Sequence, residues 1–115
     1  MTVVPSCPAL LIHEDDAFRR ELIVALDEKH FSVTFTANAA EGIKALQEKS
    51  FKVVLLSAAA AEALQYLSDH RRKGVILIAP STPDVRKYAS AVEETLMKPV
   101  AAMYVAERAS VYCRD

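Results

Sequence analysis

The chain of 115 residues contains little glycine and no long apolar run. Its two glycines, Gly42 and Gly74, do not form the glycine-rich loop that commonly holds phosphate groups, so we do not expect a tight nucleotide site. No apolar run reaches the roughly 20 residues that a membrane-spanning helix needs. The first ten residues also lack the basic region and apolar stretch of a signal peptide. We therefore expect a cytoplasmic protein without membrane partners.

Cysteine is equally scarce. Cys7 and Cys113 lie near opposite ends of the sequence, and neither has another cysteine or a histidine at metal-ligand spacing. This separation predicts two unpaired thiols without a structural role, and it predicts neither a disulfide framework nor a zinc site.

The chain also lacks an excess of either charge. Its 14 basic and 15 acidic residues nearly cancel. No strong electrostatic field therefore favours direct binding to nucleic acid.

Strand-like and helix-like patterns alternate along the whole chain, as in an α/β domain with a parallel sheet. Short apolar runs predict strands at 9–13, 31–36, 51–57, 74–79 and, more weakly, 94–97. Apolar stripes predict helices at 17–29, 38–49, 82–92 and 100–112, and a further helix before the basic residues 70–73. We predict a single domain over 1–115, with its core at about 9–112. Its fold class is a flavodoxin-like, doubly wound five-stranded sheet of order 2-1-3-4-5 with five helices.

Several residues mark the expected helix ends. Asn38 followed by Glu41 forms a capping-box pattern, and Thr82 before Pro83 predicts an N-cap. Gly74 follows the basic segment and can take a left-handed cap conformation.

Ligands of such sheets bind beyond the carboxyl ends of the strands, where the strand order reverses. Glu14, Asp15 and Ser57 are expected there, with Ala79 and Lys98 supplied by the neighbouring strands. The segments LLIHEDDAFRREL, VILIAP and TLMKPV resemble the response-regulator receiver family of two-component systems.

The resemblance implies a switch in which an acidic pair and an aspartate hold Mg²⁺ while that aspartate takes a phosphoryl group from a histidine kinase. Glu14 and Asp15 match the acidic pair and Lys98 matches the family lysine, but the phosphoacceptor position falls on Ser57. The hydroxyl residue expected after the fourth strand falls on Ala79, and the family's switch aromatic falls on Thr95. The chain therefore resembles a degenerate receiver, or pseudo-receiver.

These replacements predict a silenced site. A neutral hydroxyl in place of a carboxylate weakens Mg²⁺ binding, and nothing nearby in the sequence activates Ser57 as a nucleophile. We expect no bound metal or cofactor and no enzymatic activity. Lys98 should pair with Glu14 or Asp15 in place of the metal, and Ser57 should cap a helix that follows directly.

The function predicted from this resemblance is a protein-interaction module of a two-component system that needs no phosphorylation. The partner would be another signalling protein or a second copy, and a longer chain could carry an output domain. The expected surface, formed by the fourth helix, fifth strand and fifth helix, comprises Arg86, Lys87, Ser90, Glu94, Thr95, Tyr104 and Arg108. The alternative is that this surface is simply solvated and binds no partner.

Two alternative functions belong to other classes of protein. A degenerate receiver could sense a small-molecule ligand at the relict pocket. A hydrolase built on His13, Ser57 and Asp15 is disfavoured, because no GxSxG motif surrounds Ser57 and strand alternation points His13 away from the acidic pair.

Overall fold

The computed structural model describes residues 6–70, 74–80 and 82–113. The strands are β1 (Cys7–Ile12), β2 (Phe31–Thr36), β3 (Val53–Ser57), β4 (Val75–Ala79) and β5 (Glu94–Met97). The α-helices are α1 (Asp16–Glu28), α2 (Ala39–Glu48), α3 (Ala63–Asp69), α4 (Thr82–Tyr88) and α5 (Ala102–Ser110). Three 3₁₀ turns, η1 (Ala58–Ala60), η2 (Ala89–Ala91) and η3 (Val111–Cys113), follow β3, α4 and α5. Within the described ranges, no helix combines the length and apolar character needed to traverse a bilayer.

All paired strands are parallel, and the sheet order is β2-β1-β3-β4-β5. This confirms the predicted fold class, including the reversal of strand order beside β1. The bounds of β2 and β5 agree with the expected ranges, whereas β1 begins two residues earlier, at Cys7.

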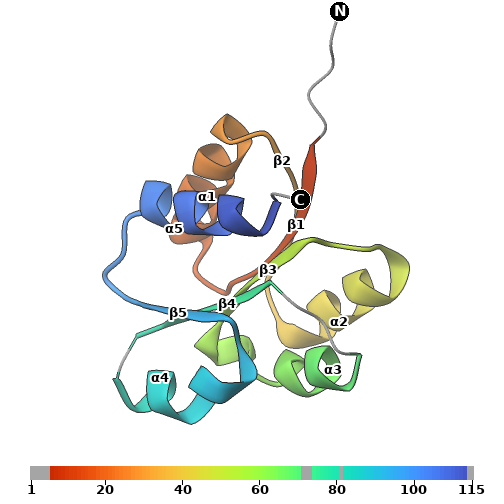
Figure 1. The fold of residues 1–115 in the computed structure, drawn as a ribbon, viewed down its shortest axis with the longest axis vertical. Coiled ribbons are helices and arrows are strands. Elements are labelled where there is room, and N and C mark those ends of the chain that lie inside the picture. The colour runs from red at the N-terminus through yellow and green to blue at the C-terminus, as the bar shows by residue number, and fades with distance from the viewer. Residues whose placement is uncertain (1–5, 71–73, 81, 114–115) are drawn as a thin grey trace, which may run out of the picture.

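Helices cover both faces of the sheet (Figure 1): α1 and α5 lie on one face, and α2 and α3 on the other. Alternate strand residues supply the two cores. Leu11 and Leu55 pack in the cluster that includes α1 and α5, whereas Leu10 and Leu56 pack in the cluster that includes α2 and α3. Every residue of β3 and β4 is buried, which explains why these strands are continuous apolar runs.

Side-chain caps begin the first two helices. The Asp15 carboxylate accepts a hydrogen bond from the Phe18 backbone N–H at 3.1 Å. Asn38 accepts one from the Glu41 N–H at 2.9 Å, which confirms the expected cap of α2. Thr82 is already the first helical residue of α4, so its prediction as the N-cap is wrong.

Gly74 adopts a left-handed backbone, with a φ angle of 75°. A β-carbon at this position would meet the Lys52 backbone carbonyl, so a side chain is disfavoured by space as well as by conformation. The left-handed glycine is confirmed. However, α3 already ends at Asp69 with His70 as its cap, and residues 71–73 lie outside the described residues.

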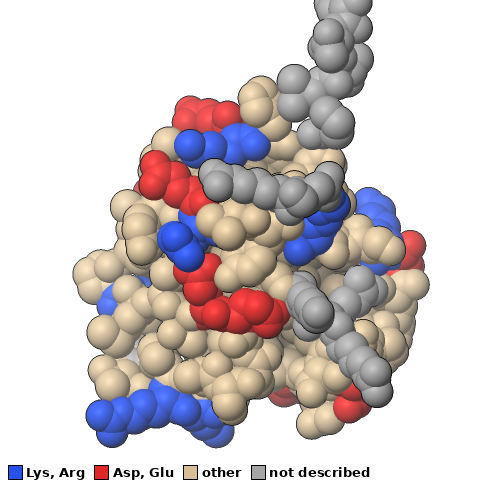
Figure 2. Space-filling view, viewed as in Figure 1, with Lys and Arg blue, Asp and Glu red and all other residues tan. Residues whose placement is uncertain are grey.

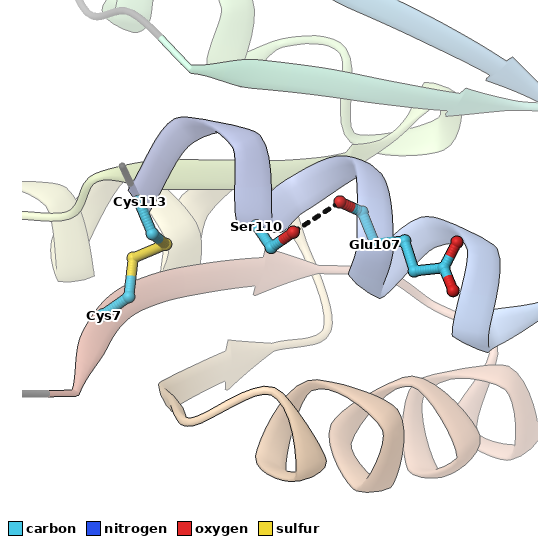
Figure 3. Close-up of a disulfide and its surroundings, with 4 residues drawn as sticks. All are labelled: Cys7, Glu107, Ser110 and Cys113. Atoms are coloured by element: carbon cyan, nitrogen blue, oxygen red, sulfur yellow. Dashed lines mark hydrogen bonds between the residues drawn. A yellow bond between two sulfur atoms is a disulfide. The ribbon is translucent and has the colours of Figure 1, made fainter. Parts of the chain in front are cut away.

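The prediction of two free thiols is wrong, because Cys7 and Cys113 form a disulfide with their Cα atoms 5.8 Å apart. Figure 3 shows the bond between the start of β1 and the turn after α5. In a parallel α/β sheet each helix runs back toward the edge where the strands begin. The end of α5 therefore returns to the start of β1, although 106 positions separate the two cysteines in sequence.

Candidate functional site

The sequence-predicted site residues meet at the carboxyl edge of the sheet, where β1 and β3 end beside each other. A hollow of about 260 Å³ lies at this edge. Its lining consists of Glu14, Asp15, Ser57, Ala59, Ile78, Pro80 and Lys98. Ala79 is fully buried at the end of β4 and does not line the hollow.

Ser57 is fully hydrogen-bonded at the end of β3. Its hydroxyl donates to the Glu14 carboxylate, with Oγ 2.7 Å from Oε1 and 3.0 Å from Oε2. The same oxygen accepts a hydrogen bond from the Ala59 backbone N–H at 3.3 Å. Ser57 is only 5% exposed, so these partners replace the water that the hydroxyl loses on burial.

The predicted capping role of Ser57 is thus confirmed, but the helix that it caps is the single turn η1. The α-helix α3 begins only at Ala63. The expectation of a helix running directly from Ser57 is therefore wrong. No sequence pattern indicates the Ser57–Glu14 hydrogen bond, because the two residues are 43 positions apart.

Glu14 remains ionised in this arrangement, although its side chain is only 48% exposed. Burial by itself would raise the pKa of the Glu14 carboxyl. Hydrogen bonds from the Ser57 hydroxyl and from its own backbone N–H outweigh that effect and lower the pKa. The hollow therefore keeps a negative charge at neutral pH.

His13 is a buried member of the site that sequence reasoning placed wrongly. Its ring is 1% exposed, and Nδ1 lies 3.0 Å from the Asp15 N–H and 3.2 Å from Glu14 Oε1. Because Nδ1 accepts the Asp15 N–H, and burial followed by the charge of Lys98 lowers the pKa of His13, the ring is neutral. The contact with Glu14 is then not an ion pair. Strand alternation failed as a guide because His13 lies in the turn after β1.

Asp15 is engaged by α1. Its Oδ1 accepts the Phe18 N–H, and this hydrogen bond is the main reason that the pKa of the Asp15 carboxyl is lowered. A carboxylate at a helix N-terminus is favoured by the partial positive charge of the first turn. Asp15 thus stabilises the start of α1 while its charge faces the hollow.

Lys98 does not pair with either acid, so that prediction is wrong. Among the described residues no ion pair joins its ammonium to Glu14 or Asp15. Nζ lies instead 4.5 Å from the centroid of the Phe18 ring, at cation–π distance. The acids already have other donors, in Ser57 and the first turn of α1, which reduces what the lysine would gain by joining them.

The donor set does not fit the Mg²⁺ ion that the resemblance implies. Mg²⁺ needs several anionic oxygens in near-octahedral geometry. Here both oxygens of Glu14 face the Ser57 hydroxyl, and an oxygen of Asp15 caps α1. In the described part of the chain no three His, Cys, Asp or Glu residues form a group that could hold a metal ion.

The geometry also argues against a serine hydrolase. In a catalytic triad the histidine lies between the serine and the acid. Here the carboxylate of Glu14 lies between Ser57 and His13, and the described residues contain no hydrogen bond from Ser57 to His13.

Residues of the predicted interaction surface lie on α4, η2, β5 and α5. Arg86, Lys87 and Ser90 are exposed, and Tyr104 is 49% exposed. Figure 2 shows basic side chains over α4 and acidic side chains nearer the centre of the same view. Thr95 is partly buried in β5 and carries no ring.

Glu94 is the central charge of this surface and has two donors. Its Oε1 accepts from Arg108 Nε at 2.6 Å, and its Oε2 accepts from the Tyr112 hydroxyl at 2.6 Å. Burial opposes ionisation of Glu94, but these bonds together lower its pKa. Burial and then Glu94 raise the pKa of Tyr112 to about 12, so the phenol stays a donor. Sequence reasoning missed Tyr112, which joins this network through η3.

No protein-family model and no curated protein matches the sequence. Several solved structures share its fold. A CheY-like receiver domain protein from Methanospirillum hungatei JF-1 has a TM-score of 0.82 at 20% identity, with 93% of each chain covered. An orphan response regulator of H. pylori has a TM-score of 0.81 at 18% identity, covering 95% of this chain and 98% of that one. A Francisella receiver domain has a TM-score of 0.84 at 14% identity, covering 93% and 96%. The chain therefore has the fold of response-regulator receiver domains.

Proposed function

We propose that the protein is a protein-interaction module of a two-component signalling system and that it works without phosphorylation. The observation that carries this proposal is Ser57, a buried hydroxyl at the phosphoacceptor position that donates to Glu14 and accepts from Ala59. Because this hydroxyl both donates and accepts a hydrogen bond, Ser57 forms a stable part of the fold.

The chemistry of the hollow supports this view. An acyl phosphate requires a carboxylate nucleophile, which Ser57 does not provide. The resemblance to receiver domains also implies that phosphoryl transfer to an aspartate needs Mg²⁺. Glu14 and Asp15 alone are a poor set of ligands for that ion. We therefore propose a protein that is neither an enzyme nor a metal-dependent switch.

The proposed interaction surface is the face formed by α4, β5 and α5. Tyr104 is a half-exposed aromatic residue, of the type enriched among energetically dominant interface residues. Arg86 and Lys87 add positive charge on α4. Because Thr95 has no ring that could move inward, we propose that this face holds one conformation and binds its partner constitutively. That partner is another signalling protein or a second copy.

The phosphorylation arm is tested by mixing the protein with acetyl phosphate and Mg²⁺ and measuring the intact mass. We expect no added phosphoryl group, and no change in melting temperature with millimolar Mg²⁺. An acid-stable or acid-labile phosphoryl group on the parent protein would contradict the proposal.

The surface arm uses the variant Arg86→Glu/Lys87→Glu/Tyr104→Ala. Arg108 is left intact, because its removal would leave the half-buried Glu94 carboxylate without its ion-pair partner. The matched control is Lys44→Glu/Lys49→Glu, which changes two exposed lysines at α2. Light scattering for self-association and pull-down for another partner should show loss only in the first variant. Equal association by both variants would refute this surface.

A second candidate function rests on the hollow of about 260 Å³ beside Lys98. Its lining combines two carboxylates, a hydroxyl and an ammonium, so a small polar ligand could bind there. The volume lies slightly below the roughly 300–1,000 Å³ of typical ligand pockets, which places this candidate second. A thermal-shift screen of polar metabolites tests it, and a hit abolished by Lys98→Met would favour ligand sensing.

A further inference from the structure

The disulfide connects two parts of the chain that differ in how deeply they are buried in the fold. Cys7 is the first residue of β1, which lies between β2 and β3 in the sheet, and is 9% exposed. Cys113 is the last residue of η3 and is partly exposed. These are the only cysteines in the chain, so no other thiol can exchange with them within the same molecule.

The helix before η3 is fixed without the disulfide. Val105, Ala106 and Ala109 of α5 are completely buried against the sheet. The Ser110 hydroxyl also donates to the Glu107 carbonyl at 2.6 Å, within the last turn of α5 (Figure 3). Loss of the disulfide would therefore leave most of α5 in place.

The turn η3 depends far more on the covalent bond. None of its three residues is buried. Tyr112 and Cys113 are only partly buried where they pack against the core, and the Val111 N–H continues the hydrogen bonds of α5. In the described residues the Tyr112 hydroxyl bond to Glu94 is the side-chain hydrogen bond that ties this turn to the sheet. A solvent-accessible turn with few contacts opens at low free-energy cost.

The position of η3 affects the interaction surface through Glu94. Tyr112 donates to one oxygen of Glu94 while Arg108 donates to the other, each at 2.6 Å. If η3 moves away, Glu94 loses one of its two donors, and Arg108 becomes its sole partner in this network. The hydrogen bonding of the Glu94 carboxylate on β5 then changes, while its ion pair with Arg108 of α5 remains.

The chemistry of disulfides limits how such a bond can be used. Disulfides persist in oxidising compartments, whereas those of cytosolic proteins are usually transient or redox-sensing. We expect the protein to be cytoplasmic, so a disulfide at a loosely held turn matches the second situation. Since Cys113 is the more exposed partner, an incoming thiolate is expected to attack its sulfur and displace the Cys7 thiolate.

We propose that the Cys7–Cys113 disulfide is a redox-sensitive clasp that holds η3 against β1 and sets the partners of Glu94. In the reductive step a dithiol supplies two electrons and two protons. The sulfur–sulfur bond breaks, two cysteine thiols form, and the dithiol becomes a disulfide. The consequence for partner binding rests on the function proposed above, whereas the clasp itself does not.

Hydrogen exchange followed by mass spectrometry tests the clasp on the full chain, with and without dithiothreitol. At short labelling times, where local opening and not global unfolding dominates exchange, we expect peptides that include 111–113 to exchange about fivefold faster or more after reduction, while peptides from α2 change little. Equal protection of 111–113 in both states at these times would overturn the proposal, and so would a uniform loss of protection that includes α2.

The matched control is Cys7→Ser/Cys113→Ser. It should exchange like the reduced parent, and dithiothreitol should not change it further. Alkylation and intact mass establish the thiol state of each sample. Two alkylated cysteines in the air-oxidised parent would show that no clasp forms and would overturn the proposal.

A switch must also respond to a biological reductant. The oxidised parent is equilibrated with a mostly reduced glutathione buffer and then alkylated. Reduction of most molecules is expected, whereas retention of the disulfide in nearly all of them would make it a permanent staple and refute the clasp.

The partner arm separates the two proposals. Association is compared for oxidised and reduced parent by light scattering and pull-down. A difference that disappears in the serine variant supports redox control of the surface. Faster exchange at 111–113 with unchanged association supports the clasp and refutes redox control of the proposed surface.

Discussion

Restoring a carboxylate at the end of β3 should destabilise the protein at neutral pH. In Ser57→Asp, a second negative charge replaces a hydroxyl whose oxygen lies 2.7 Å and 3.0 Å from the two oxygens of Glu14. The variant loses the hydrogen bond and gains a repulsion. The matched control is Ser57→Asn, which has a similar shape and an N–H that can still donate to Glu14.

The size of the effect follows from distance and exposure. Two unit charges about 4 Å apart interact by about 4 kcal/mol at an effective dielectric constant of about 20. The Glu14 side chain is 48% exposed and can turn toward water, which screens the repulsion. We therefore expect Ser57→Asp to be about 1–2 kcal/mol less stable than Ser57→Asn at pH 7.

The assay is urea unfolding of both variants between about pH 4 and pH 7. The like charges raise the pKa of the carboxyl pair in the folded state, so the folded state binds more protons than the unfolded state. The deficit should be small below the ordinary carboxyl pKa and should grow as the pH rises through the raised folded value. Equal stability of the two variants at pH 7 would refute the assigned geometry of Glu14 and Ser57.

Three further predictions concern other parts of the fold. Reduction of the Cys7–Cys113 bond, whose cysteines are 106 positions apart, should lower the unfolding free energy by about 2–5 kcal/mol, and an unchanged urea midpoint would argue against the bond. Gly74→Ala should cost more than about 1 kcal/mol, because the left-handed backbone and the Lys52 carbonyl both disfavour a β-carbon; a neutral melting temperature would contradict this. Glu94, whose pKa is lowered by its two donors against the effect of burial, should add stability that is lost as the pH falls below its ordinary 4.5. The gap between parent and Glu94→Gln should therefore shrink in acid, and a gap independent of pH would contradict that role.

The sheet could be predicted from sequence because its signals are local. The apolar runs of β3 and β4 reflect burial on both faces, and the cap at Asn38 depends on residues three positions apart. Given five alternating units, the rules for right-handed crossovers leave few topologies. The residues at the carboxyl edge of the sheet can then be predicted as well, because they are the residues at which each strand ends.

The contacts inside the site could not be predicted in the same way. The predicted strand order places two acids, Glu14 and Asp15, near Lys98. However, Ser57 and the first turn of α1 already donate hydrogen bonds to those carboxylates. His13 lies where strand alternation no longer applies. These outcomes depend on competition between side chains from separate elements, which no spacing rule describes.

The disulfide was missed for a different reason. Their separation of 106 positions suggests that Cys7 and Cys113 are far apart, whereas the topology returns the last helix to the edge where the first strand begins. The predicted fold therefore already implies that residues after the last helix lie close to the start of the first strand.

The bond also makes the molecule a closed covalent ring from Cys7 to Cys113. A protease that cuts one peptide bond inside this ring leaves the oxidised protein in a single covalent piece, which separates into two fragments only under reducing conditions. New chain ends could likewise be opened in a surface loop while the bond maintains the neighbourhood of β1 and η3. In its oxidised state, the region from Cys7 to Cys113 therefore resembles a cyclic protein.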